Sequence, residues 1–385
     1  MSRRAPVLLI LFSLPLLPTA RQAAAQAGDG RGDSAPQITT DRARRIDSVF
    51  AAFDNTRSPG CATGVLTNGE LAFARGYGMA SLDHGIPITP ETIFRTGSVS
   101  KQFTAAVVVL LAREGAFTLD DGIRLHFPEI PEYQAPITIR HLLHHTSGLR
   151  DYLELMAMRG VGDEATYKEE DVVELLSKQK ALNFPPGSEF RYSNSGYLLL
   201  SRLVERATGQ TLREQARRLI FGPLGMEATH FHDNHREVVP RRATGYGLGP
   251  DGGFGIDQTT LDIVGDGGVF TSIRELQHWM RNYWTLEVGG ADWLSAMETR
   301  GVLSSGDTLS YALGLGHGVQ RGIPFVGHGG AFVGYKAATL RYPREDVGVM
   351  VLCNFGRVDP MGLALQVGEA VLDDEMGPPP SDSPQ

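Results

Sequence analysis

The hydrophobic positions along the chain change period twice, which predicts strands at both ends around a helical middle. The stretch CATGVLTNGELAFARGYGMA contains two strand-like runs joined by Asn68-Gly69, a strong signal for a β-hairpin. Four short apolar runs separated by turn residues predict further strands at 311–320, 323–328, 334–342 and 348–353. This order predicts an α+β fold with one antiparallel sheet formed by the N- and C-terminal segments.

The middle of the chain carries the pattern of helices. Residues 98–114 are apolar on nearly every face, which predicts a buried helix. Residues 244–268 are rich in glycine without any period and are expected to form a long functional loop. Further helices are expected at 41–53, 138–145, 168–180, 194–208, 211–221, 272–280 and 361–373.

The N-terminus has the pattern of a cleaved signal peptide over residues 1–27. Arg3 and Arg4 precede an apolar run at 7–17, and an A-x-A cleavage motif follows at 25–27. The apolar run is too short to span a bilayer as a helix. We therefore expect an exported protein, periplasmic or secreted, without stable membrane insertion after cleavage.

The rest of the chain divides into a lead, one domain and a tail. Residues 28–40 are expected to be a flexible lead and residues 374–385 a disordered tail. The domain between them, 41–373, is expected to have two parts. The α/β part covers about 41–120 and 300–373, and the helical part about 121–299.

Composition narrows the function classes. The net charge is −8 and 21% of residues are charged, without any basic block, so a nucleic acid or an anionic membrane surface is a poor partner. Composition does not indicate the oligomeric state. The two cysteines, Cys61 and Cys353, both lie in apolar strand-like runs, so buried free thiols and a disulfide both stay open.

Ser98 and Lys101 stand three residues apart at the start of the predicted buried helix. A serine hydroxyl needs a base within hydrogen-bond reach, and a buried lysine can act as that base. The spacing alone is weak, because serine and lysine are also common in the polar first turn of a helix. A second S-x-x-K, from Ser177 to Lys180, looks like a solvated helix end.

Two later segments carry further candidates. Tyr192-Ser193-Asn194 precedes an apolar helix, where the tyrosine could relay a proton and the asparagine could hold a substrate carbonyl. The alternative is a packed tyrosine and a helix-capping asparagine. His328-Gly329-Gly330 ends a predicted strand, where glycines let a ligand approach the backbone; a glycine-rich bulge is the alternative.

Together, the three ordered motifs resemble those of the serine β-lactamase and penicillin-binding-protein superfamily. The chain is most similar to its class C β-lactamase-like branch, which includes esterases, D-aminopeptidases and DD-peptidases. The resemblance extends over about residues 40–373 and includes LLHHTSGL at 142–149 and GGVFTSIRELQHW at 267–279. It implies the class C β-lactamase-like form of the α+β fold.

The resemblance also implies roles for individual residues. Ser98 would be the acylated nucleophile and Lys101 its base or proton relay. Tyr192 would activate the serine or the deacylating water, and Asn194 would orient the substrate. The backbone N–H groups of Ser98 and Ala331 would form the oxyanion hole, the usual serine acyl-transfer arrangement without a His-Asp pair.

His328 departs from the lysine of the K-T-G form of this motif. With Gly329 and Gly330 it would contact the substrate, but histidine is mostly uncharged near neutral pH and suits a substrate carboxylate less well. Esters, amides and D-amino-acid peptides are therefore the expected substrates, with weak β-lactam hydrolysis as a side activity. The alternatives are a true β-lactamase, a cell-wall DD-peptidase or a binding protein without turnover.

We expect neither a metal nor an organic cofactor. His141, His144 and His145 have metal-like spacing, as do His230 and His232, but neither group has a nearby acid in an H-E-x-x-H arrangement. The G-x-S-x-G elbow does not occur in the sequence, and no G-x-x-x-x-G-K-[ST] or G-x-G-x-x-G motif supports nucleotide binding.

The resemblance finally bears on the cysteines. In the similar fold the first strand lies antiparallel beside the last. That pairing would bring Cys61 towards Cys353.

Overall fold

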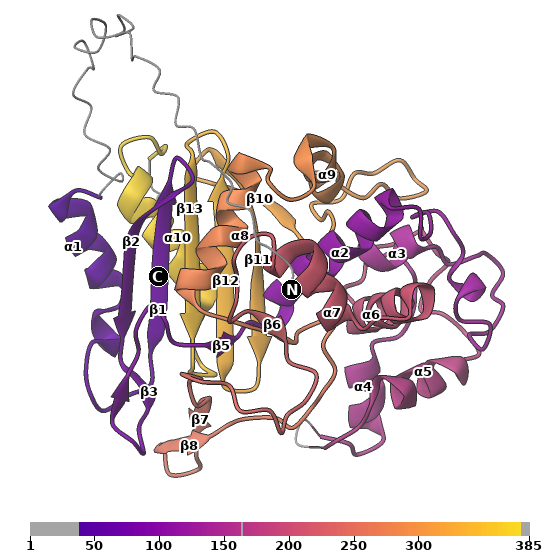
Figure 1. Cartoon of the computed structure of the whole chain (residues 1–385), viewed down its shortest axis with the longest axis horizontal. Coiled ribbons are helices and arrows are strands. Elements are labelled where there is room, and N and C mark those ends of the chain that lie inside the picture. The colour runs from indigo at the N-terminus through magenta and orange to yellow at the C-terminus, as the bar shows by residue number, and fades with distance from the viewer. Residues whose placement is uncertain (1–37, 163–164, 379–385) are drawn as a thin grey trace, which may run out of the picture. The chain divides into compact units, whose positions relative to one another are not determined.

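The computed structural model of the protein describes residues 38–162 and 165–378. The predicted signal peptide, most of the predicted lead and the last part of the tail lie outside these residues. The largest sheet has six antiparallel strands in the order β10-β11-β12-β13-β1-β2 (Figure 1). Its strands are β1 (Cys61–Thr67), β2 (Glu70–Tyr77), β10 (Gly316–Gln320), β11 (Ile323–Phe332), β12 (Tyr335–Tyr342) and β13 (Val347–Cys353). The α+β prediction is confirmed.

The first and last strands of this sheet are neighbours, as the resemblance implied. The hairpin between β1 and β2 turns at Asn68 and Gly69, which both have positive φ (52° and 77°), as this two-residue turn requires. On its other side β1 pairs with β13, and Cys61 lies opposite Cys353. These two cysteines form a disulfide, so the question that composition left open is answered in favour of pairing.

Helices cover both faces of the sheet, which explains why the central strand β13 is apolar and buried along its whole length. Helices α1 (Thr40–Val49) and α10 (Pro360–Leu372) pack against each other, and α10 contacts β12 and β13. Helix α8 (Ile273–Thr285) contacts β1, β2 and β13. Along β1, Cys61 and Val65 join the core beside α1 and α10, while Ala62 and Leu66 join the other core.

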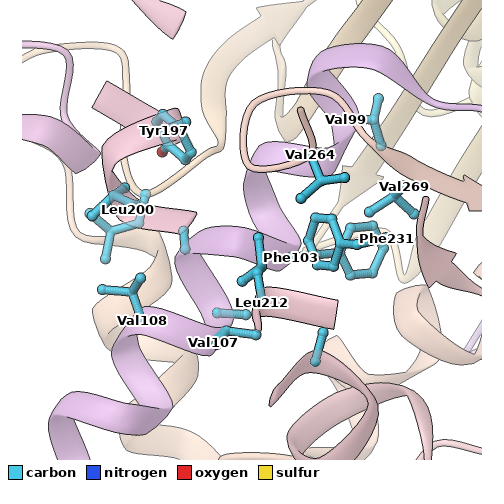
Figure 2. Close-up of a cluster of buried hydrophobic side chains, with 14 of the residues drawn as sticks. Val99, Phe103, Val107, Val108, Tyr197, Leu200, Leu212, Phe231, Val264 and Val269 are labelled. Carbon is cyan, nitrogen blue, oxygen red and sulfur yellow. The ribbon is translucent and has the colours of Figure 1, made fainter. Parts of the chain in front are cut away.

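Helix α2 (Lys101–Arg113) is the centre of the helical part of the fold. Ten of its thirteen residues are buried, which agrees with its apolar sequence on every face. Figure 2 shows how its Phe103 and Val107 meet apolar side chains from other segments, among them Phe231 and Val264. It packs against α6 (Asn194–Thr208), α7 (Leu212–Ala216) and α9 (Gly290–Glu298). Helices α3 (Ile139–Leu143), α4 (Tyr152–Met158) and α5 (Glu169–Ser177) pack in turn against α6.

The remaining strands form small sheets. Strands β5 (Phe94–Arg95), β9 (Val269–Thr271) and β6 (His230–Phe231) make a three-stranded sheet beside the start of α2. The other two sheets pair β3 (Met79–Ser81) with β4 (Ile86–Pro87) and β7 (Tyr246–Leu248) with β8 (Phe254–Ile256).

Several boundaries differ from the sequence prediction. The expected loop at 244–268 contains the β7–β8 hairpin, because its glycines allow tight strand pairing. Helices α4 and α9 are additional, since the sequence predicted no element at either place. The start of the predicted tail is ordered, since Met376 is buried and Gly377 donates a backbone hydrogen bond to Arg321. Within the described residues, we find no helix both long and apolar enough to cross a bilayer.

Candidate active site

The segment around Ser98 is a short 3-10 turn that leads directly into α2. The turn spans Gly97–Ser100 and follows strand β5. Ser100 holds the turn in place, because its buried Oγ accepts a hydrogen bond from the backbone N–H of Val269 at 2.9 Å. Ser98 is only partly buried, and its hydroxyl faces Lys101. The structure thus distinguishes Ser100, which holds the turn, from Ser98, whose hydroxyl faces the lysine.

Lys101 is fully buried and has three polar contacts. Its Nζ lies 3.1 Å from Ser98 Oγ, 2.8 Å from Asn194 Oδ1 and 2.8 Å from the backbone oxygen of Asp266. The last two oxygens can only accept hydrogen bonds, so they take two N–H groups of the lysine whatever its charge. When the amine is uncharged, its lone pair is therefore directed at the Ser98 hydroxyl. This geometry can pass the serine proton to the lysine.

Tyr192 lies over the lysine. Its ring centroid is 4.9 Å from Lys101 Nζ and 4.2 Å from the ring centroid of His145. Tyr192 is 37% exposed, so it is not the packed core residue that the alternative interpretation assumed. The helix cap of α6 is Ser193, and the side chain of Asn194 bonds Lys101 instead. The Tyr192 and Asn194 side chains thus meet at the same lysine.

Strand β11 brings its glycine-rich segment against the serine turn. A Cβ on Gly330 would lie 2.0 Å from the backbone oxygen of Thr96 and 3.0 Å from the Ser98 nitrogen, so only glycine fits. A Cβ on Gly97 would in turn lie 2.7 Å from the Ala331 nitrogen. The backbones of Ser98 and Ala331 therefore lie at one corner, where two N–H groups could stabilise an oxyanion.

His328 lies on the same strand and is held as a neutral ring. Its Nδ1 contacts the Gly329 carbonyl oxygen, which only accepts, so Nδ1 carries the proton and Nε2 accepts from Tyr311 Oη at 2.9 Å. Burial, followed by the charge of Lys101, lowers the pKa of His328 to about 4. The ring therefore offers no positive charge to a substrate carboxylate at neutral pH.

His145 is a site residue that sequence reasoning considered only as a metal ligand. Its carbonyl accepts the N–H of Arg191, and its Nδ1 accepts the N–H of Ser193 at 3.2 Å. Its ring stacks on Tyr192 between them. Burial and the Lys101 charge hold the pKa of His145 well below its usual range. The histidine thus clamps the tyrosine turn from three sides, and its only sequence signal was the LLHHTSGL segment.

The first histidine group does not form a metal site. The Nδ1 atom of His141 accepts from the Thr138 nitrogen, and His144 is bonded to the backbone oxygens of Arg140 and Thr299. His145 faces Ser193 instead. The three rings therefore bond separate backbone groups.

The second histidine group does have an acid nearby, contrary to the sequence interpretation. Glu237 joins His230 and His232, with one possible ligand atom from each residue within 4.8 Å of the others. The sequence pattern missed it because the chain folds back after His232. However, Arg213 binds both Glu237 carboxylate oxygens, at 2.6 and 2.8 Å, so this carboxylate already has a cationic partner.

The fold and this corner of convergent groups define a serine hydrolase of the β-lactamase type. The chain belongs to the Beta-lactamase family, whose model matches residues 46–370.

Two named relatives are similar to this chain over most of its length. The D-aminopeptidase of Cereibacter sphaeroides (strain KD131) is 30% identical over 314 residues, which cover 80% of this chain and 59% of that protein. The D-aminopeptidase of Brucella anthropi is 30% identical, over 78% of this chain and 56% of its own length. The chain therefore spans less than three fifths of the length of these relatives.

Two solved structures share the fold. An octameric penicillin-binding protein homologue from Pyrococcus abyssi superposes with a TM-score of 0.76 at 27% identity, over 86% of this chain and 77% of that one. The D-amino acid amidase from Ochrobactrum anthropi SV3 superposes with a TM-score of 0.72 at 23% identity, over 87% and 100%.

Proposed function

We propose that this protein hydrolyses amide bonds of D-amino-acid amides or short D-amino-acid peptides through an acyl-enzyme on Ser98. The observation that carries the proposal is the contact of Lys101 Nζ with Ser98 Oγ at 3.1 Å, with two carbonyl oxygens occupying the other N–H groups of the lysine. The names of the relatives, D-aminopeptidase and D-amino acid amidase, support the substrate class.

In the acylation step, Lys101 takes the Ser98 proton as Oγ attacks the substrate carbonyl carbon. The tetrahedral intermediate places its oxyanion at the backbone N–H groups of Ser98 and Ala331. The C–N bond then breaks, and Tyr192 relays a proton to the leaving amine. Asn194 orients the substrate amide. The products of this step are an ester on Ser98 and a free amine or ammonia.

Deacylation reverses the roles. A water molecule loses a proton to Tyr192 or Lys101 and attacks the ester carbon, again with the oxyanion at the Ser98 and Ala331 nitrogens. The bond between Ser98 Oγ and the acyl carbon breaks, and the serine regains its proton. A carboxylic acid leaves.

The same steps would act on simple esters and, weakly, on β-lactams. The neutral His328 supports this ranking: a penicillin carries a carboxylate, and a ring whose pKa is about 4 gives it no positive partner at pH 7. Substrates without a carboxylate beside the scissile bond do not need such a partner.

Export to the periplasm or the outside of the cell is part of the proposal. It rests on the signal-peptide pattern at 1–27. The disulfide between Cys61 and Cys353 supports it, because disulfides persist mainly in oxidising compartments.

The test compares four substrates with the full chain and its Ser98→Ala variant. They are a D-amino-acid anilide, its L counterpart, a short-chain chromogenic ester and a labelled penicillin. We expect turnover of the D-anilide above its L counterpart, a drop of about 10⁴-fold or more in kcat/KM with Ser98→Ala, and an acyl adduct on Ser98 by mass spectrometry.

The other outcomes separate the alternatives. A stable penicilloyl adduct without any turnover would favour a DD-peptidase or a binding protein, and fast penicillin turnover a true β-lactamase. Unchanged anilide or ester turnover in Ser98→Ala would refute the mechanism.

A further inference from the structure

Asp151 lies beside the active-site corner, at a position that none of the three motifs includes. It is the N-cap of α4, where its Oδ1 accepts the backbone N–H of Leu153 at 2.9 Å. Its Oδ2 accepts two hydrogen bonds from Asn194, one from the backbone nitrogen at 2.5 Å and one from Nδ2 at 3.0 Å. One carboxylate thus ties the start of α4 to the start of α6.

The carboxylate determines which way the Asn194 amide points. A carboxylate accepts hydrogen bonds and does not donate them, so it selects the Nδ2 end of the amide. The Oδ1 end is then directed at Lys101 Nζ, 2.8 Å away. The reverse orientation would place the Nδ2 donor against the N–H groups of Lys101 and Oδ1 against the Asp151 carboxylate, two repulsive contacts in a partly buried site.

The other acceptor of Lys101 needs no such control. The backbone oxygen of Asp266, at 2.8 Å, belongs to a rigid peptide group and cannot exchange with a donor. Arg95 fixes this loop further by donating to the backbone oxygens of Ile263 and Gly267. Of the two carbonyl oxygens that accept from Lys101, only the Asn194 oxygen belongs to a side chain. Its direction therefore depends on a neighbouring residue.

We propose that Asp151 is a positioning residue that orients the Asn194 amide and so keeps the Lys101 amine directed at Ser98. The proposal rests on the proposed function of Ser98 and Lys101. Asp151 itself does not touch the substrate. It acts by holding one of the two acceptors that leave the lysine lone pair facing the serine hydroxyl.

Two variants separate this role from helix capping. Asp151→Ser keeps an N-cap side chain for α4 but is too short to reach Asn194. Asp151→Asn keeps the size and a capping oxygen but can present either end of its amide, so the Asn194 amide is free to reverse. For both variants we expect acylation of Ser98 to slow by about 10- to 100-fold, because misplacement of a reacting group has costs of this size.

The decisive measurement combines Asp151→Ser with Asn194→Ala. Rates of Ser98 acylation by labelled penicillin or by the anilide are measured in single-turnover experiments, with the melting temperature of each variant. If Asp151 acts through Asn194, Asp151→Ser adds less than about twofold to the loss already caused by Asn194→Ala.

Three outcomes would overturn the proposal. A wild-type rate of Ser98 acylation in Asp151→Ser would refute the proposal. So would a double variant in which the losses from Asp151→Ser and Asn194→Ala multiply. A loss that follows the melting temperature in both backgrounds assigns Asp151 a structural role only. The Ser98→Ala control distinguishes these failures from failure of the proposed function, because activity that does not need Ser98 rejects the mechanism itself.

Discussion

The same four-residue pattern occurs at two places in this chain with opposite results. At Ser98 it begins the buried helix α2, and Lys101 is fully enclosed among three oxygen atoms. At Ser177 it ends the amphipathic helix α5, where the serine hydroxyl only donates back to the Glu174 carbonyl at 2.7 Å. Lys180 is exposed to solvent.

The difference lies in what surrounds the pattern. The first S-x-x-K is followed by an apolar run that forces the lysine into the core, where its charge must find polar partners. The second follows a helix with one polar face, so its lysines remain in water and Lys178 pairs with Glu174. A serine and a lysine three residues apart thus share a set of converging polar contacts only where the lysine is buried.

The largest expected effect comes from removing the lysine amine of the first S-x-x-K motif. The same change in the second motif is the control. Lys101→Met preserves length in an enclosed site but removes the base, and we expect kcat/KM to fall by about 10²- to 10⁴-fold, the range of general base catalysis. The matched change Lys180→Met should leave kcat/KM within about twofold. Steady-state kinetics on the best anilide or ester measures both. Similar losses in the two variants would remove the distinction between the two motifs.

A second, smaller effect concerns the close approach of the β11 backbone to the serine turn. In Gly330→Ala the new Cβ would meet the Thr96 oxygen at 2.0 Å, so β11 must move away from the serine turn. We expect a loss of about 10²-fold in kcat, because an oxyanion donor moves with the strand. Gly255→Ala in β8 is the control, since no described atom lies within 4 Å of its added Cβ. Wild-type kcat in Gly330→Ala would show that the strand does not supply the donor.

Much of the fold follows from local sequence. The Asn68-Gly69 hairpin and the strands at 323–342 follow from alternation and turn residues, and α6 (Asn194–Thr208) was predicted with its observed bounds. The prediction missed the helices α4 and α9. It also weakened in the glycine-rich 244–268 segment, where pairing depends on tertiary contacts.

The site was predictable as a set of residues but not as a network. Motif resemblance singled out Lys101 and Asn194, and the structure joins them by a hydrogen bond. Motif resemblance could not reveal the backbone oxygen of Asp266 as an acceptor, because every residue type carries a backbone carbonyl. Asp151 and His145 were missed for another reason: each acts on a partner more than forty residues away, which a single sequence does not reveal.

The smallest expected effect is a pH dependence of stability that the buried corner has and the surface motif lacks. The pKa of His328 is about 4 in the folded protein, below the ordinary value of about 6.5 that applies after unfolding. Between these values the unfolded chain binds a proton that the folded one excludes. The stabilisation is therefore complete above about pH 6.5 and is lost as pH falls towards 4. His328→Gln keeps an acceptor for Tyr311 but does not titrate, so between pH 7 and 5 it should lose about 2 kcal/mol less unfolding free energy than the wild type. Urea unfolding at the two pH values measures this difference, with His84→Gln at an exposed position as the control. An equal loss in His328→Gln and the wild type would mean that the ring beside Lys101 already carries its proton at pH 5.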